Sequence, residues 1–205
     1  MRRKYLVALL VLIVLIPFTV LAALYYEAGK RLDDVTYTAL VYANEALISL
    51  RDVPIILQKV RQDLEQYNCS PALFRRMKPD IAMYDYFVLF VNSMRLESLR
   101  AHLYMAYKAS GLQMPVNLTI GISRMADYFQ DLSQDYYSAM IGGKPFRCEM
   151  IPDNTTLTSL KEAIDKTYEE ISQLLQDKEE FKGLTRDTIQ MILKVGVTLE
   201  KTKAG

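Results

Sequence analysis

The stretch that decides the fold runs from residue 32 to residue 67 and reads LDDVTYTALVYANEALISLRDVPIILQKVRQDLEQY. Apolar side chains recur in it at alternating steps of three and four residues over about ten turns, the pattern of one face of a long amphipathic helix. Pro54 interrupts the run just after Asp52, which can cap a helix, so we expect a kink or a break there. The apolar face consists of Leu32, Ala39, Ala43, Ala46, Leu50, Val53, Leu57, Val60, Leu64 and Tyr67.

A second helix is predicted downstream, opening at Pro79-Asp80 and closing at Ser110-Gly111. Its first part, residues 81–91, is apolar nearly all round, and on composition alone this part also fits a strand. We predict a helix because the apolar pattern continues to Leu103 without a turn signal.

Three further helices follow in the same way. Residues 118–139 keep four-three spacing and end at Gly142-Gly143. Ser159, with Glu162 three residues later, forms a capping box that starts a helix reaching Gly183, and a last helix covers about residues 185–201. Convincing strands are absent from the pattern. The sequence therefore predicts an all-α fold, with an N-terminal transmembrane helix followed by a four- or five-helix antiparallel bundle.

The transmembrane prediction comes from the N-terminus, where Met1-Arg2-Arg3-Lys4 precedes an unbroken apolar run over residues 5–26. As a helix this run is about 33 Å long, enough to cross a hydrocarbon core of roughly 30 Å. Basic residues before the run predict a cytoplasmic N-terminus. We therefore expect a signal-anchor over residues 1–28, an extracytoplasmic helical domain over residues 29–205, and a single-pass inner (plasma) membrane localisation with the C-terminal domain periplasmic or extracellular.

A cleaved signal peptide is the alternative for the same segment. Val20-Leu21-Ala22 has small residues suited to signal peptidase, and Pro17 stands where signal peptides often leave the helix. Against cleavage, the apolar run is longer than usual and continues to Tyr25 and Tyr26, which suit the aromatic belt of a membrane interface. Both readings remain open at this point, and both export the rest of the chain.

The charge balance excludes one class of partner. Of 25 basic residues, three lie before the apolar run, which leaves 22 against 24 acidic residues and a net charge near −2. Nucleic-acid binding needs a clustered basic face, so we expect no nucleic-acid partner. The remaining length of about 180 residues suits one domain with its own core.

Two cysteines, Cys69 and Cys148, lie in predicted loops next to prolines. In an exported protein they are expected to form one disulfide, and closing a loop of about 80 residues contributes roughly 4–5 kcal/mol in the chain-entropy model. The alternative is a pair of unpaired buried thiols. Asn68, Asn117 and Asn154 stand in acceptor sequons, which are glycosylation sites in a eukaryotic secretory pathway and otherwise ordinary residues ahead of helices.

The sequence gives little support for a metal site or for a catalytic site. His102 is the only histidine, which excludes zinc sites and catalytic triads that need several. Asp127, Asp131 and Asp135 share one helix face, where we expect Arg124 to pair with Asp127 and solvent to hold the others. No second set of oxygen ligands for calcium is identifiable. We therefore expect no cofactor and no enzymatic activity.

The chain is rich in tyrosine and methionine, with 14 and 10 residues respectively. Such side chains line adaptable pockets for apolar ligands, although helical spacing also fits a plain bundle core. The residues predicted to contact an apolar ligand are Tyr84, Tyr86, Met94, Tyr104, Met105 and Tyr107.

One stretch resembles a known family. An N-terminal anchor, a long helix with Ala39, Ala43 and Leu50, and then residues 69–77, CSPALFRRM, resemble the opening of the CSS-motif periplasmic sensor domain. In that family the domain precedes a cyclic-di-GMP phosphodiesterase module, and the resemblance implies that Cys69 is the first of two redox-active cysteines. The Cys-Ser-Ser triplet of the family's second half is missing, and no catalytic module follows. The resemblance, over about residues 5–80, therefore implies an envelope sensor or interaction domain without phosphodiesterase activity.

These observations predict a membrane-anchored, non-enzymatic sensor or protein-interaction module of the cell envelope. The long stripe through Ala43 is expected to form a coiled-coil seam, so the partner is a second copy or an envelope protein. The alternative function is a tethered or secreted carrier that binds an apolar ligand in a Tyr/Met-lined helical pocket.

Overall fold

The computed structural model describes residues 2–66, 74, 77–142, 144–177 and 180–204, with side chains from Thr19 onward. Over these residues the chain is helical and contains no strand, which confirms the all-α class and the helical bundle. The helices are α1 (Arg2–Leu50), α2 (Val53–Gln66), α4 (Pro79–Ala109), α5 (Val116–Met140), α6 (Asn154–Asp177) and α7 (Arg186–Ala204), with the short 3-10 helix η1 (Cys148–Met150) ahead of α6.

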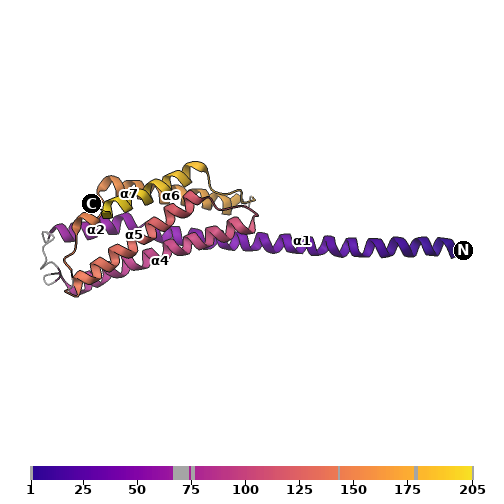
Figure 1. The fold of residues 1–205 in the computed structure, drawn as a ribbon, viewed down its shortest axis with the longest axis horizontal. Helices are drawn as coiled ribbons and strands as arrows, with labels where there is room; N and C mark the ends of the chain where they lie inside the picture. Colours follow the sequence, from indigo (N-terminus) through magenta and orange to yellow (C-terminus); the bar gives the residue numbers. More distant parts are fainter. Residues whose placement is uncertain (1, 67–73, 75–76, 143, 178–179, 205) are drawn as a thin grey trace.

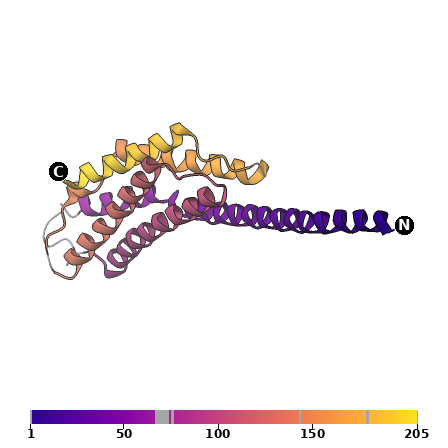
Figure 2. The same cartoon turned by 45° about the vertical axis from the view of Figure 1, so that its right-hand side comes forward.

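The helices pack as a ring around one core. The C-terminal half of α1 packs against α4, α4 against α5, α5 against α7, and α7 against α6, which closes the ring on α1 and α2. The N-terminal half of α1 extends away from the bundle, as both ribbon views show (Figures 1 and 2). Side chains that are fully buried in this core include Leu57, Leu103, Leu118, Ile122 and Leu199.

The predicted break at Pro54 is confirmed. α1 ends at Leu50 and α2 begins at Val53, so Pro54 occupies the second position of the new helix. The first four N–H groups of a helix have no intrahelical acceptor, so a residue without an N–H is tolerated there.

The apolar stripe over residues 32–67 faces the inside of this same chain. Apart from Leu32, which is half exposed, and Tyr67, which lies outside the described residues, all its members are buried, and Ala43 is completely so. Its small side chains let α4 and α6 pack closely against α1. The stripe is therefore buried by packing within the same chain. It is not exposed as the coiled-coil seam for a second copy that its spacing predicts.

The helix ends follow local signals, except at α6. This helix ends at Asp177, six residues before the predicted end at Gly183, and it also begins earlier than predicted. Gly111 (φ 69°) and Gly142 (φ 86°) adopt the left-handed conformation just beyond α4 and α5, where helix ends were predicted. α6 begins at Asn154, five residues before the predicted capping box at Ser159. Asp153 explains the difference, because its Oδ1 accepts a hydrogen bond of 2.7 Å from the N–H of Thr156 and so caps the helix earlier.

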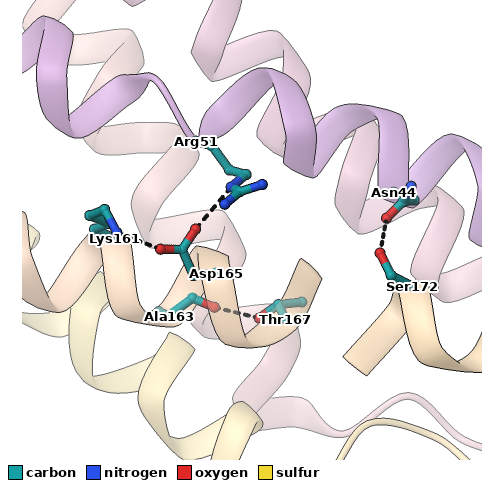
Figure 3. A network of polar contacts seen from close by, with 7 residues as sticks. All are labelled: Asn44, Arg51, Lys161, Ala163, Asp165, Thr167 and Ser172. Atoms are coloured by element: carbon teal, nitrogen blue, oxygen red, sulfur yellow. Dashed lines mark hydrogen bonds and ion pairs between the residues drawn. The ribbon is translucent and has the colours of Figure 1, made fainter. Parts of the chain in front are cut away.

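Polar contacts fasten the end of α1 to α6 (Figure 3). Asp165 accepts hydrogen bonds from Lys161 Nζ (2.7 Å) and Arg51 Nε (3.0 Å), and these partners, Lys161 foremost, hold the pKa of its carboxyl below the ordinary value. About two turns along, Ser172 Oγ donates to Asn44 Oδ1 at 3.0 Å. These contacts orient α6 along α1, on the side of α1 away from α4.

Two glycines set the closest helix crossing, between α5 and α7. A Cβ added to Gly121 would lie 2.8 Å from the backbone N of Leu193, and one added to Gly196 would lie 2.6 Å from the carbonyl oxygen of Gly121. Real Cβ atoms do not approach so closely. The two backbones therefore touch only because both positions lack a side chain.

The membrane prediction is not supported. The apolar run over residues 5–26 belongs to α1, which continues without interruption through Glu27, Lys30 and Arg31 into the bundle. In the described part of the chain, no helix combines the length and the apolarity that crossing a membrane requires. The predictions of a transmembrane helix over residues 1–28 and of a single-pass localisation with an exported C-terminal domain are therefore not supported.

Candidate interaction surface

Helix α4 carries apolar side chains on two opposite faces. The inner stripe is spaced for a helix face and is buried in the core; it contains Ala82, Leu89, Leu96, Leu99, Leu103 and Ala106. On the opposite side, at steps of four, three, four, seven and four residues, lies a second set that we call the outer stripe. The outer stripe consists of Met83, Phe87, Phe90, Met94, Ala101 and Met105.

The outer stripe faces solvent. The exposed fractions are 50% for Met83, 60% for Phe87, 40% for Phe90, 59% for Met94 and 46% for Met105. A helix that is apolar all round is ordinarily buried on all sides. Contiguous exposed apolar surface of this kind marks a binding site more often than a free surface.

Aromatic side chains from the neighbouring helices widen this surface. On the α5 side, the ring of Tyr86 lies 6.1 Å from that of Phe90 and 5.1 Å from that of Tyr137. On the α1 side, the half-exposed Tyr42 stacks on His102 with ring centroids 5.2 Å apart. The exposed apolar surface thus spans α4 and reaches the edges of both helices that flank it.

The six residues predicted to bind an apolar ligand do not all point the same way. Tyr84, Met94, Tyr104 and Met105 are about half exposed on the outer side of α4, whereas Tyr86 is partly buried at its junction with α5. Tyr107 lies on the inner side. It is 3% exposed, and its hydroxyl accepts a hydrogen bond of 2.8 Å from the N–H of Leu184. The structure therefore gathers four of the six on one open surface and separates Tyr107 from them.

Two hollows of the bundle are lined by other residues. One, of about 420 Å³, lies between the start of α5 and the start of α7 and is lined by Val116, Arg186 and Ile189 among others. The second, of about 360 Å³, is polar and lies between α5 and α7. Neither contains any of the six predicted ligand residues.

The polar hollow contains two ion pairs between α5 and α7. Asp131 forms an ion pair with Lys203, and Arg124 Nε pairs with Glu200 Oε2 at 3.2 Å. The expected pairing of Arg124 with Asp127 on the same helix is therefore wrong. α7 crosses this face of α5 and supplies charged partners that the local spacing does not reveal.

His102 occupies a structural position at the edge of the bundle. Besides stacking on Tyr42, its Nδ1 lies 3.2 Å from Ser98 Oγ one turn earlier on α4. Its surroundings are those of a core-edge side chain.

A buried carboxyl group lies on the inner side of α4. Asp85 is 1% exposed; Tyr136 donates a hydrogen bond of 3.2 Å to its Oδ2, and its Oδ1 has no partner. The pKa of Asp85 is raised to about 6. Burial is the largest cause; the hydrogen bond from Tyr136 lowers the pKa, the negative charge of Asp63 on α2 raises it and the charge of Lys59 lowers it. Asp63 also has a buried oxygen without a partner, Oδ2. The sequence signal for this group is an acidic residue at an inner-stripe position, three residues after Ala82 and four before Leu89.

Only one of the two cysteines that are predicted to form a disulfide lies among the described residues. Cys148 is the first residue of η1, is partly buried against the core and is not a free thiol. Cys69 lies outside the described residues, so the pairing of the two stays a prediction. Of the sequon asparagines, Asn117 and Asn154 are exposed in the first turns of α5 and α6, and Asn68 lies outside the described residues.

Comparison with protein families, curated proteins and solved structures finds no match for this chain. The motif that resembles the CSS-motif domain, residues 69–77, falls mostly outside the described part of the structure, which includes only Phe74 and Met77 of it.

Proposed function

We propose that this protein is a non-enzymatic protein-interaction module whose outer stripe on α4 docks a partner protein. One observation carries the proposal: α4 has two opposite apolar faces, and the bundle covers only one of them. Burying apolar area releases about 25 cal/mol per Å², so an uncovered stripe of large side chains is a ready source of binding free energy.

The shape of the surface favours a protein over a small ligand. Small-molecule sites are concave and enclose most of the ligand. The outer stripe instead lies along the convex side of a helix, with aromatic side chains at its edges. Methionine and aromatic residues are enriched in the cores of protein interfaces, where their flexibility and large contact area help two surfaces fit together.

Site-specific photo-crosslinking in producing cells tests this function. A photoreactive phenylalanine analogue placed at Phe87 is expected to give discrete crosslinked species. The same analogue at Gln173, an exposed position on α6, serves as the control because α6 lies on the far side of the bundle from α4 (Figures 1 and 2). Equal crosslinking at both positions, or none at Phe87, would show that the outer stripe is not a docking face.

A second variant separates docking from folding. Phe87→Glu places a charge near the N-terminal end of the outer stripe, at its most exposed phenylalanine, and leaves the inner stripe unchanged. We expect it to abolish crosslinking from an analogue at Met94 while helical circular dichroism and the unfolding midpoint stay close to those of the unsubstituted protein.

A further inference from the structure

We infer that the outer stripe pairs with the outer stripe of a second copy of this chain, the two α4 helices running antiparallel about a two-fold axis near Met94. This inference rests on the proposed function and names its partner. A two-fold interface is self-complementary, so each residue on one side of the axis must fit a residue at the matching distance on the other side.

The sequence of α4 has this self-complementarity. In an antiparallel pair centred on Met94, residues at equal distance from it meet. Met83 and Met105 are both 11 residues away and lie opposite each other, and Phe87 lies opposite Ala101, each seven residues away. A large side chain facing a small one lets two helices interdigitate. A parallel pair would instead set each phenylalanine against its own copy.

The tyrosines beside the stripe obey the same relation. Tyr84 and Tyr104 are each ten residues from Met94, and both are about half exposed. Because they lie on opposite flanks of the outer stripe, one rim of the pair would carry Tyr84 of both copies and the other rim Tyr104 of both copies, with their hydroxyl groups still able to reach water.

Charges at the two ends of the helix favour the antiparallel direction. Asp80 and Lys108 are exposed and stand 14 residues on either side of Met94. Neither makes an ion pair with another described residue. Antiparallel pairing brings Asp80 of one copy to Lys108 of the partner subunit at both ends of the interface. Parallel pairing would set Asp80 against Asp80, which is unfavourable.

The available area is of the size that a dimer needs. The five large side chains of the outer stripe and the two flanking tyrosines are 40 to 60% exposed. At about 200 Å² for a fully exposed large side chain, they offer roughly 700 Å² on each copy, against about 800 Å² per partner in a standard interface. Tyr42 on α1 and Tyr137 on α5 stand at the edges and are exposed enough to supply the remainder.

Cysteine crosslinking of the full chain tests both the dimer and its direction. Met94→Cys is expected to crosslink to itself with a short bismaleimide and to give a species of twice the chain mass, whereas Gln173→Cys on α6 is not. Met83→Cys and Met105→Cys should each crosslink weakly alone and strongly when the two variants are mixed. Self-crosslinking of Met83→Cys without mixing would indicate a parallel pair and overturn the inference.

A charge reversal supplies an independent readout. Asp80→Lys should weaken the dimer about fivefold to tenfold in sedimentation velocity, because it removes two ion pairs and adds two repulsive ones. Adding Lys108→Asp to the same chain should restore the original dissociation constant. An unchanged dissociation constant in the single variant would show that these two charges do not meet.

The results also separate this inference from the proposed function. If the full chain stays monomeric at all concentrations while Phe87 still crosslinks to a protein of another mass, the self-pairing is wrong and the docking function stands. If neither a dimer nor a Phe87-specific crosslink forms, both are wrong.

Discussion

At the scale of single residues, Asp85 couples the stability of the bundle to pH. Burial raises its pKa to about 6, whereas a carboxyl in the unfolded chain titrates near 3.8. The native state therefore holds this proton more tightly, so the stabilisation is fully present below about pH 4 and is lost as the pH rises to about 6. We expect the free energy of unfolding to decrease by roughly 2–3 kcal/mol over this range through Asp85 alone.

Chemical denaturation at several pH values, with the unsubstituted protein and Asp85→Asn, measures this effect. Asparagine keeps an oxygen for the Tyr136 hydroxyl and carries no charge, so the variant should gain stability relative to the unsubstituted protein as the pH rises from 4 to 6.5. Asp127→Asn, at an exposed position on α5, is the matched control. Parallel stability profiles for Asp85→Asn and the unsubstituted protein would contradict the prediction.

Tyr128 makes a buried hydrogen bond that joins α5 to η1. Its hydroxyl donates to the carbonyl oxygen of Met150 at 2.7 Å, and both residues are about 1% exposed. Tyr128→Phe leaves that carbonyl without its donor in the core, which should destabilise the protein by about 1–3 kcal/mol. Tyr137→Phe removes a hydroxyl from a 43% exposed ring on the same helix and should change stability by less than about 0.5 kcal/mol. Equal urea midpoints for the two variants would refute this role of Tyr128.

At the scale of helices, the crossing of α5 and α7 depends on the absence of two side chains. Gly121→Ala would place a Cβ within 2.9 Å of the backbone at Ile192 and Leu193, which cannot move aside as a flexible side chain can. We expect a loss of about 1–3 kcal/mol and a lower thermal midpoint.

Gly29→Ala is the matched control for this crossing. Gly29 also lies within a helix, but a Cβ there meets nothing within 4 Å. Alanine should therefore stabilise the protein by about 0.5–1 kcal/mol, because it restricts the unfolded chain without a clash. If both glycine variants shift the thermal midpoint in the same direction, the close crossing is not what Gly121 provides.

α4 shows how far an apolar pattern can be interpreted. Residues 81–91 are apolar nearly all round, and the prediction of a helix there is confirmed. The pattern alone did not distinguish a face buried in the chain's own core from one left open. Both stripes are apolar, the inner one of leucine and alanine and the outer one mainly of methionine and phenylalanine, and the packing of α1 and α5 against α4 decides which of them is buried.

At the scale of the whole molecule, the two cysteines are predicted to staple the segment after α2 to η1. Cys148→Ser should then abolish the faster migration of the oxidised protein in non-reducing electrophoresis. It should also lower the free energy of unfolding by about 2–5 kcal/mol, since the bridge restricts the unfolded chain. Reaction of both thiols with a maleimide in the native oxidised protein would rule out the bridge.

The sequence by itself determined where most helices begin and end. The break at Pro54, the start at Pro79 and the left-handed ends at Gly111 and Gly142 all appear as expected, because each depends on backbone chemistry within a few residues. The all-α class followed from the same local signals, together with the apolar period of the stripe through Ala43.

Only the tertiary structure decided what those helices pack against. It directed the Ala43 stripe into the bundle, paired Arg124 with Glu200 and brought Gly121 against Gly196. It also left the outer stripe of α4 uncovered. Helical periodicity specifies that one face of a helix is apolar. Whether another helix buries that face depends on contacts between residues far apart in the chain, and the spacing of residues within one helix carries no information about those contacts.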